Sequence, residues 1–141
     1  MNTPYVIERT YDAPIEKVWQ ALIDPEKMKQ WYFDIPDFKP VLGHEFEFYG
    51  GSKDVKFKHL LKITELVEGK KLSYTWKYED LPGNSEVSFE LFEEGDKTRL
   101  KLIHKGLESF EMIDNPMFGR DSFNKGWTMI IGTNLKDYLE K

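Results

Sequence analysis

The sequence contains no cysteine among its 141 residues. It therefore has no disulfide framework, no thiol nucleophile and no cysteine zinc site, and this absence fits a reducing compartment. No apolar run approaches the roughly 18 residues that a membrane-spanning helix needs. The opening stretch MNTPYVIERTYD has neither a basic leader nor an apolar core. We therefore expect a cytoplasmic protein without membrane insertion.

Motifs of the common enzyme classes are also missing. The sequence has no GxSxG, P-loop or GxGxxG motif and no paired-carboxylate signature, which removes the usual hydrolase, nucleotide-binding and dehydrogenase hypotheses. Its three histidines are too dispersed for a metal-site spacing. We expect no shared catalytic group, no metal and no cofactor. The formal charge of −5 disfavours nucleic acid as a partner.

Aromatic residues are abundant, at 15% of a chain that is 40% hydrophobic. The length is that of one ordinary domain, and there is no repeat, long linker or low-complexity block, so residues 1–141 are expected to form a single domain. Aromatic side chains bury much area but leave irregular gaps. The composition therefore favours a fold with a cavity over a solidly packed one.

Residues 12–32 predict two short helices in succession. Apolar side chains recur at helical spacing in the first of them, at Ile15, Val18, Trp19 and Leu22. Pro14 suits the first helical position because its missing N–H would be unpaired there. Asp24 is expected to cap the second helix, with Pro25 as its first residue.

Alternation of apolar and polar residues predicts an antiparallel meander around this helix pair, with strands over 4–11, 44–49, 55–66, 72–78, 87–91 and 99–105. One face is apolar and needs a cover. The other carries basic residues, which form either a solvated strand face or a surface for an acidic partner: Lys56, Lys58, Lys62, Lys77, Arg99, Lys101 and Lys105. If the strand registers hold, Leu60, Phe92 and Ile103 add a small apolar patch there.

A long last helix is predicted over 118–140, about 34 Å in length and able to cross the sheet. Asn115 and Pro116 can start it. Gly126 and Gly132 weaken it locally, so we expect either a bend near Gly126 or a helix start close to that residue.

The order of strand, two short helices, meander and long last helix resembles the α+β helix-grip fold, also called START-like, Bet v-like or SRPBCC. Four segments are similar to the small stand-alone bacterial form of the family named for the activator of the heat-shock protein 90 ATPase. They are residues 9–19 (RTYDAPIEKVW), 24–31 (DPEKMKQW), 99–106 (RLKLIHKG) and Gly126–Trp127. The resemblance implies a cavity between a curved sheet and the last helix, usually for a hydrophobic small molecule, and it implies no shared catalytic residue.

The cavity is expected to be lined by inward residues of the sheet and of the last helix. His59 and His104 are among them. Each either has a functional role, as a ligand contact or a general base, or is a core histidine with satisfied hydrogen bonds. Tyr74, Trp76 and Tyr78 likewise either line a pocket or fill the core. The loop after Trp31 and Tyr32 is expected near the mouth. The full candidate set is Phe46, Phe48, Phe57, His59, Tyr74, Trp76, Phe89, His104, Trp127 and Ile131.

Three functions are open at this point. The first is a binding protein for a hydrophobic or aromatic small molecule without evident catalysis. The second, suggested by the family resemblance, is a co-chaperone that acts on a heat-shock protein 90 type ATPase. The third is an enzyme that resembles the aromatase and cyclase members of the superfamily, in which a histidine or tyrosine would move protons.

Overall fold

The structure is a computed structural model that describes residues 3–51, 56–115 and 118–140. A six-stranded antiparallel sheet has the order β1-β6-β5-β4-β3-β2. Its strands are β1 (Tyr5–Tyr11), β2 (Glu45–Gly51), β3 (Lys56–Val67), β4 (Lys71–Tyr78), β5 (Ser85–Glu94) and β6 (Lys97–Lys105). Its helices are α1 (Ile15–Ile23), α2 (Pro25–Trp31), the short 3₁₀ helix η1 (Leu107–Phe110), α3 (Arg120–Met129), the π-helical η3 (Ile130–Asn134) and α4 (Leu135–Leu139).

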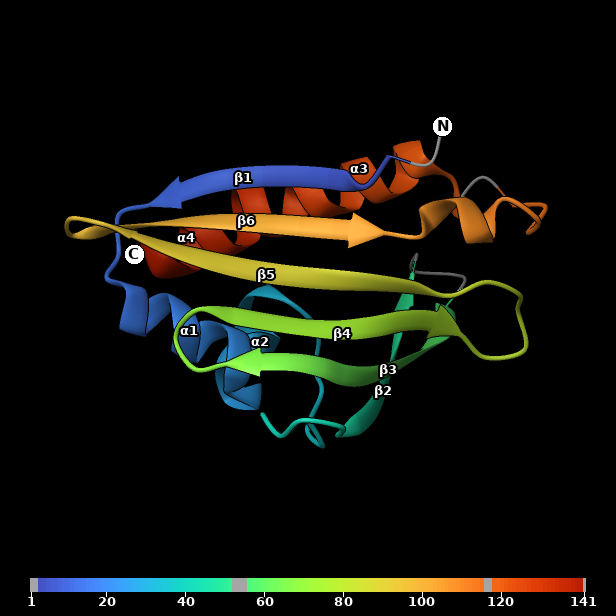
Figure 1. Ribbon diagram of the computed structural model, residues 1–141, viewed down its shortest axis with the longest axis horizontal. Coiled ribbons are helices and arrows are strands. Elements are labelled where there is room, and N and C mark those ends of the chain that lie inside the picture. The colour runs from blue at the N-terminus through green and yellow to red at the C-terminus, as the bar shows by residue number, and fades with distance from the viewer. Residues whose placement is uncertain (1–2, 52–55, 116–117, 141) are drawn as a thin grey trace.

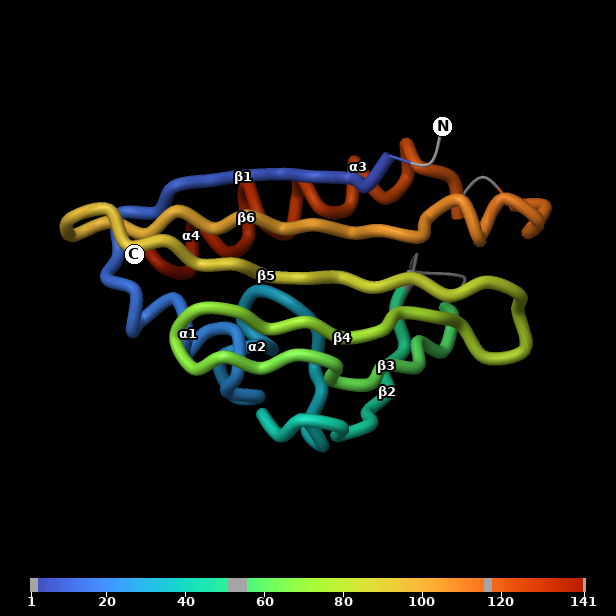
Figure 2. The backbone as a smooth tube through the Cα atoms, viewed as in Figure 1, coloured from blue at the N-terminus to red at the C-terminus, as the bar shows by residue number. Residues whose placement is uncertain are grey.

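Apart from η1, which follows β6 at the end of the sheet, the helices lie on one face of the sheet (Figure 1). The C-terminal segment α3–η3–α4 runs behind β1 and β6, and the α1–α2 pair lies toward the β3 and β4 side (Figure 1). The backbone trace shows the same arrangement (Figure 2). The predicted helix-grip architecture is therefore confirmed. In the described residues, no helix is long and apolar enough to cross a membrane.

The start of the helix pair follows local rules, with one difference. The Asp24 side chain accepts a hydrogen bond from the Glu26 amide at 2.9 Å, and Pro25 is the first residue of α2, as predicted. The pKa of Asp24 is lowered because this backbone hydrogen bond and the nearby Lys27 favour its carboxylate. Pro14, by contrast, is the N-cap of α1 and not its first helical residue. Its ψ of 154° is extended, and its carbonyl accepts from Lys17 and Val18.

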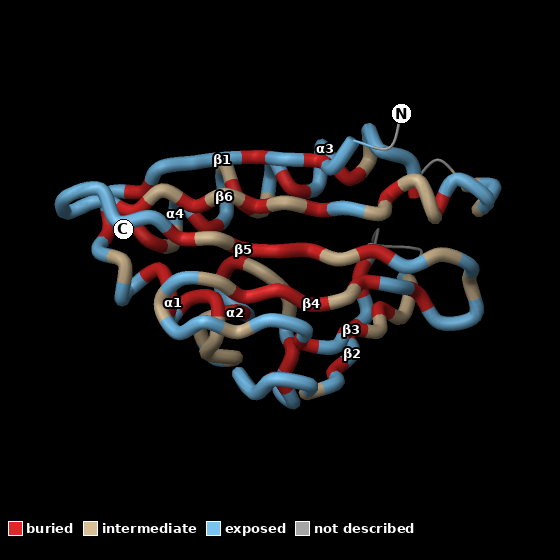
Figure 3. Tube along the Cα trace, in the orientation of Figure 1, coloured by how far each residue is buried: buried red, intermediate tan, exposed pale blue. Residues whose placement is uncertain are grey.

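The inner face of the sheet is apolar, as the alternation predicts. Leu72, Tyr74, Trp76 and Tyr78 are buried along β4, and the same alternation of buried and more exposed positions marks β6. Figure 3 shows the buried stretches concentrated along the central strands and the exposed stretches at the turns.

The outer face carries both signs of charge, because carboxylates accompany the basic residues predicted there. Lys58 pairs with Glu47 and Glu79 at 2.7 and 3.3 Å. Arg99 pairs with Glu8 and Glu94 at 2.6 and 3.0 Å. Carboxylates on neighbouring strands, or directly after them, thus pair with some of these basic side chains.

The small apolar patch expected on this outer face does not form. Leu60 lies on β3, whereas Phe92 and Ile103 lie on β5 and β6 at different levels of the sheet: Phe92 is opposite Arg99, and Ile103 is opposite Ser88. The Arg99 guanidinium also covers the Phe92 ring, 4.3 Å from its centroid. These side chains are therefore scattered among polar ones.

The last helix differs from its prediction. It begins at Arg120, after Gly119, and Gly126 lies inside α3, so the helix does not start at Gly126. The irregular part is the π-helical η3, which contains Gly132. There the Tyr11 hydroxyl, on β1, donates to the Ile131 carbonyl at 2.6 Å. This backbone carbonyl of the helical segment therefore accepts a hydrogen bond from a side chain of the sheet. Two predicted boundaries, at Val55 and Pro116, fall outside the described residues.

Candidate functional site

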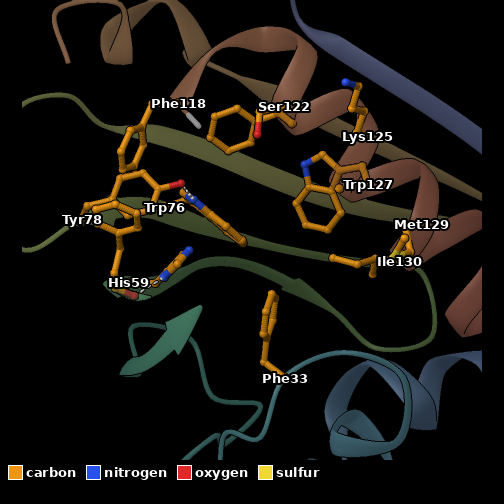
Figure 4. A pocket seen from close by; sticks show the side chains of 13 residues that line it. Phe33, His59, Trp76, Tyr78, Phe118, Ser122, Lys125, Trp127, Met129 and Ile130 are labelled. Carbon is orange, nitrogen blue, oxygen red and sulfur yellow. Dashed lines mark hydrogen bonds between the residues drawn. The ribbon is translucent and has the colours of Figure 1, made fainter. Parts of the chain in front are cut away.

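A pocket of about 650 Å³ lies between the inner face of the sheet and α3. Figure 4 shows Phe33 on one side, His59, Trp76 and Tyr78 from the sheet, and Trp127 and Ile130 from the helical segment opposite. Most of the lining is aromatic or aliphatic. The lining residues are Phe33, Phe57, His59, Trp76, Tyr78, Phe118, Ser122, Phe123, Lys125, Gly126, Trp127, Met129 and Ile130.

Four of the ten candidate residues lie on the wall of this pocket: Phe57, His59, Trp76 and Trp127. The other six lie outside the lining and are buried: Phe46, Phe48, Tyr74, Phe89, His104 and Ile131. Of the aromatic series on β4, Trp76 and Tyr78 line the pocket and Tyr74 belongs to the core.

The packed residues are covered by side chains from distant segments. Phe46 packs edge-on against Phe38 with ring centroids 5.0 Å apart. The Tyr74 hydroxyl lies 2.8 Å from that of Tyr32. These contacts fill the half of the sheet face near the helix pair, so the pocket occupies only the other half.

Sequence reasoning did not select several wall residues. Ser122, Gly126 and Ile130 are one helical turn apart, and Phe123 and Trp127 lie beside them, so all five share one face of the helical segment. Helical spacing applied to every residue of this segment, and not only to the apolar ones, would have found this face. Phe33 lies in the loop after α2, where no periodic signal exists.

His104 is held in the core by a chain of hydrogen bonds. The Trp127 indole N–H donates to its Nδ1 at 3.1 Å. Because an indole can only donate, Nδ1 must be the acceptor, and Nε2 therefore carries the proton. Nε2 lies 2.8 Å from the Ser85 hydroxyl, which donates in turn to the Trp76 carbonyl at 2.8 Å. Both ring nitrogens are thus occupied, and burial lowers the pKa of His104 to about 3.

His59 has a different environment. Its ring stacks on Phe48 with centroids 4.5 Å apart, and its Nδ1 lies 2.9 Å from the Phe57 carbonyl. Since a carbonyl only accepts, Nδ1 carries the proton and Nε2 keeps its lone pair. Burial lowers the pKa of His59 to about 4, although the backbone hydrogen bonds oppose that shift. The ring extends into the pocket toward Trp76 (Figure 4).

Tyr78 supplies a second polar group on the same wall. Its hydroxyl oxygen accepts from the Trp76 indole N–H at 2.9 Å. Burial raises the pKa of Tyr78, so the phenol keeps its proton. Phe118 packs edge-on against the Tyr78 ring at 4.7 Å and closes this end of the wall. The tyrosine is therefore fixed in place and still has a proton to donate.

The interior of the pocket is uncharged. Lys125 is the one ionised side chain among the described lining residues; it is exposed, and its amine extends away from the cavity (Figure 4). Within the described part of the chain, no three His, Asp or Glu side chains gather as a metal site. The wall therefore offers an apolar surface with a few neutral polar groups: the His59 acceptor, the Tyr78 donor and the Ser122 hydroxyl.

Comparison with known proteins gives a consistent assignment. The sequence model of the family described as activator of Hsp90 ATPase homolog 1-like protein matches residues 12–140. No curated protein matches the sequence.

Three solved bacterial structures are similar over most of this chain. Protein MLL2253 from Mesorhizobium loti is 28% identical with a TM-score of 0.76, and 98% of this chain and 97% of that chain are covered. CalU16 from Micromonospora echinospora is 27% identical with a TM-score of 0.71, covering 94% of this chain and 71% of that one. Protein BH1534 from Bacillus halodurans is 25% identical with a TM-score of 0.76, and 99% of each chain is covered. Because the family model spans nearly the whole sequence, the chain belongs to the family of activator of Hsp90 ATPase homolog 1-like proteins.

Proposed function

We propose that this protein binds an apolar, aromatic small molecule in the pocket between the sheet and α3. The observation that carries the proposal is a space of about 650 Å³ with an aromatic, uncharged wall. That volume lies within the range of pockets that enclose small organic ligands. The sequence-based candidates Phe57, His59, Trp76 and Trp127 form part of the proposed site.

Affinity would come from burial of the ligand's apolar surface. Removing about 200 Å² of such surface from water contributes about 5 kcal/mol before the entropic costs of association. An isolated fragment would therefore bind weakly. The polar groups on the wall would orient the ligand more than they would hold it.

Ligand-observed NMR detects such weak binding and is the direct test. The library would contain lipids, sterols, flavonoid-like aromatics and polyketides. In protein-observed ¹H–¹⁵N spectra, a binder is expected to shift the indole N–H resonances of Trp76 and Trp127 and to leave that of Trp19, on α1, unchanged. Binding that shifts neither pocket indole, or a library in which nothing binds, would contradict the proposal.

The family assignment supports a second candidate, action on an Hsp90-type ATPase. It would use the protein's surface and would not need an occupied pocket. The test is the ATPase rate of the cognate chaperone at saturating concentrations of this protein. An unchanged rate would count against this candidate and would leave the binding proposal standing.

Cyclase-like chemistry, the third possibility, would fall to His59 and Tyr78. His104 is unsuited to it because both of its ring nitrogens are engaged in the core. The pocket lining that the structure describes contains no carboxylate to act as a partner base. These points favour a binding protein over an enzyme.

A further inference from the structure

His59 and Tyr78 are direct neighbours across two strands. They are register partners on β3 and β4, so their side chains leave the same face of the sheet at the same level. Their rings meet edge to face with centroids 4.7 Å apart. Both side chains are more than nine-tenths buried, and both line the pocket.

The two groups have complementary hydrogen-bonding capacity. Tyr78 already accepts from Trp76, so its remaining capacity is to donate its own proton. His59 donates from Nδ1 to the Phe57 carbonyl, and the backbone of Phe48 also lies within hydrogen-bonding reach of the ring. Because the neutral ring has a single proton, its remaining capacity is to accept at Nε2. Among the described residues, the two do not hydrogen-bond to each other. Figure 4 shows both beside Trp76, on the same side of the pocket.

We infer that the pocket recognises a hydroxyl-bearing aromatic ligand, with the hydroxyl placed between Tyr78 and His59. The ligand oxygen would accept from the Tyr78 hydroxyl and donate its own proton to His59 Nε2. This inference rests on the proposed function and specifies its ligand class.

The ligand hydroxyl would complete a hydrogen-bond chain in which every group between the two ends both accepts and donates. The chain runs from the Trp76 indole N–H through Tyr78, the ligand and His59 to the Phe57 carbonyl. Hydrogen bonds in such chains polarise and strengthen one another, more so in a site with little water. A ligand that lacks the hydroxyl would leave a buried donor and a buried acceptor unpaired, which is costly.

Three probes that share the naphthalene ring system separate the two contacts. 2-Naphthol can accept from Tyr78 and donate to His59, 2-methoxynaphthalene can only accept, and 2-methylnaphthalene can do neither. Titrations followed by the Trp76 indole resonance should give the strongest binding for 2-naphthol. The methyl ether, which cannot donate, should bind up to about tenfold more weakly than 2-naphthol. 2-Methylnaphthalene, which also cannot accept, should bind up to about tenfold more weakly than the ether.

Two variants assign the contacts to residues. His59→Leu should abolish the preference for 2-naphthol over the methyl ether, and Tyr78→Phe should abolish the preference for the ether over 2-methylnaphthalene. Tyr49→Phe is the matched control, since Tyr49 is 64% exposed and lies outside the pocket. Folding of each variant is checked by circular dichroism, and if one fails to fold, the other variant and the wild-type ranking decide.

Equal affinities of the three probes would overturn this inference while leaving the proposed function intact. The same holds if either variant folds and keeps the wild-type ranking. If none of the probes binds up to its solubility limit and the wider library also fails, the proposed function falls together with the inference.

Discussion

Gly126 allows the helix and the pocket to be tested at one position. It lies inside α3 and on the pocket wall, and a Cβ added there would meet no heavy atom within 4 Å outside its own local helix. Gly126→Ala should therefore stabilise the protein by about 1 kcal/mol, because alanine loses less backbone entropy than glycine in a helix. For a chain of 141 residues, with an unfolding entropy of about 0.3 kcal/mol/K, the melting temperature should rise by about 3 °C.

A larger residue at the same position should block the pocket. Gly126→Phe projects a ring from the helix wall toward the sheet, whereas Gly126→Ala leaves the space open. We expect the alanine variant to bind a pocket ligand within about twofold of wild type and the phenylalanine variant to lose at least about tenfold in affinity. Thermal unfolding followed by circular dichroism gives the stability, and ligand-observed NMR gives the binding.

The control is a second glycine-to-alanine substitution, at a position whose backbone conformation disfavours alanine. Gly106 has a φ of +90°, and an added Cβ would lie 3.0 Å from the Asn84 carbonyl oxygen, so Gly106→Ala should lower the melting temperature. A lowered melting temperature for Gly126→Ala would refute the reasoning about α3. Undiminished ligand binding by a folded Gly126→Phe would refute the assignment of the pocket.

Two further outcomes follow from the buried histidines. His59 and His104 have folded-state pKa values of about 4 and 3, below the ordinary value of about 6.5. The unfolded chain therefore takes up protons first, so stability is complete above about pH 6.5 and is lost progressively as the pH falls toward the folded-state values. Urea unfolding should show the unfolding free energy falling by about 4 kcal/mol from pH 8 to pH 5, and a flat profile would contradict the burial of both rings. Ser85→Ala should destabilise the protein by about 1–3 kcal/mol because it leaves the buried His104 Nε2–H without its acceptor, and an unchanged urea midpoint would argue against the hydrogen-bond chain.

The architecture was predictable because its signals are local. Alternation along 72–78 specifies which face of β4 is buried, and Asp24 followed by Pro25 specifies a helix start. Neither signal depends on contacts that are distant in the sequence. The position of the irregular helical turn was missed because it depends on such a contact, that between Tyr11 and the Ile131 carbonyl.

The extent of the pocket could not be predicted for the same reason. Alternation marks a whole sheet face as inward, but it does not say which inward residues are covered by other segments. Phe46 is covered by Phe38 and Tyr74 by Tyr32, contacts set by the path of the loop after α2. A cavity is the part of the inward face that no segment fills, so it requires the complete packing.

The two inward histidines show what separates a structural residue from a candidate functional one. His59 and His104 occupy equivalent positions in their strand patterns, and burial lowers the pKa of both. The difference lies in the hydrogen bonds of the rings. In His104 both nitrogens are bonded within the core, to Trp127 and Ser85, whereas the Nε2 of His59 belongs to a ring that lines the pocket. Since that difference arises from Trp127 and Ser85, far away in the sequence, no strand pattern contains it. Substitution of His104 should therefore act on stability and on the position of Trp127, whereas substitution of His59 should act on ligand selectivity.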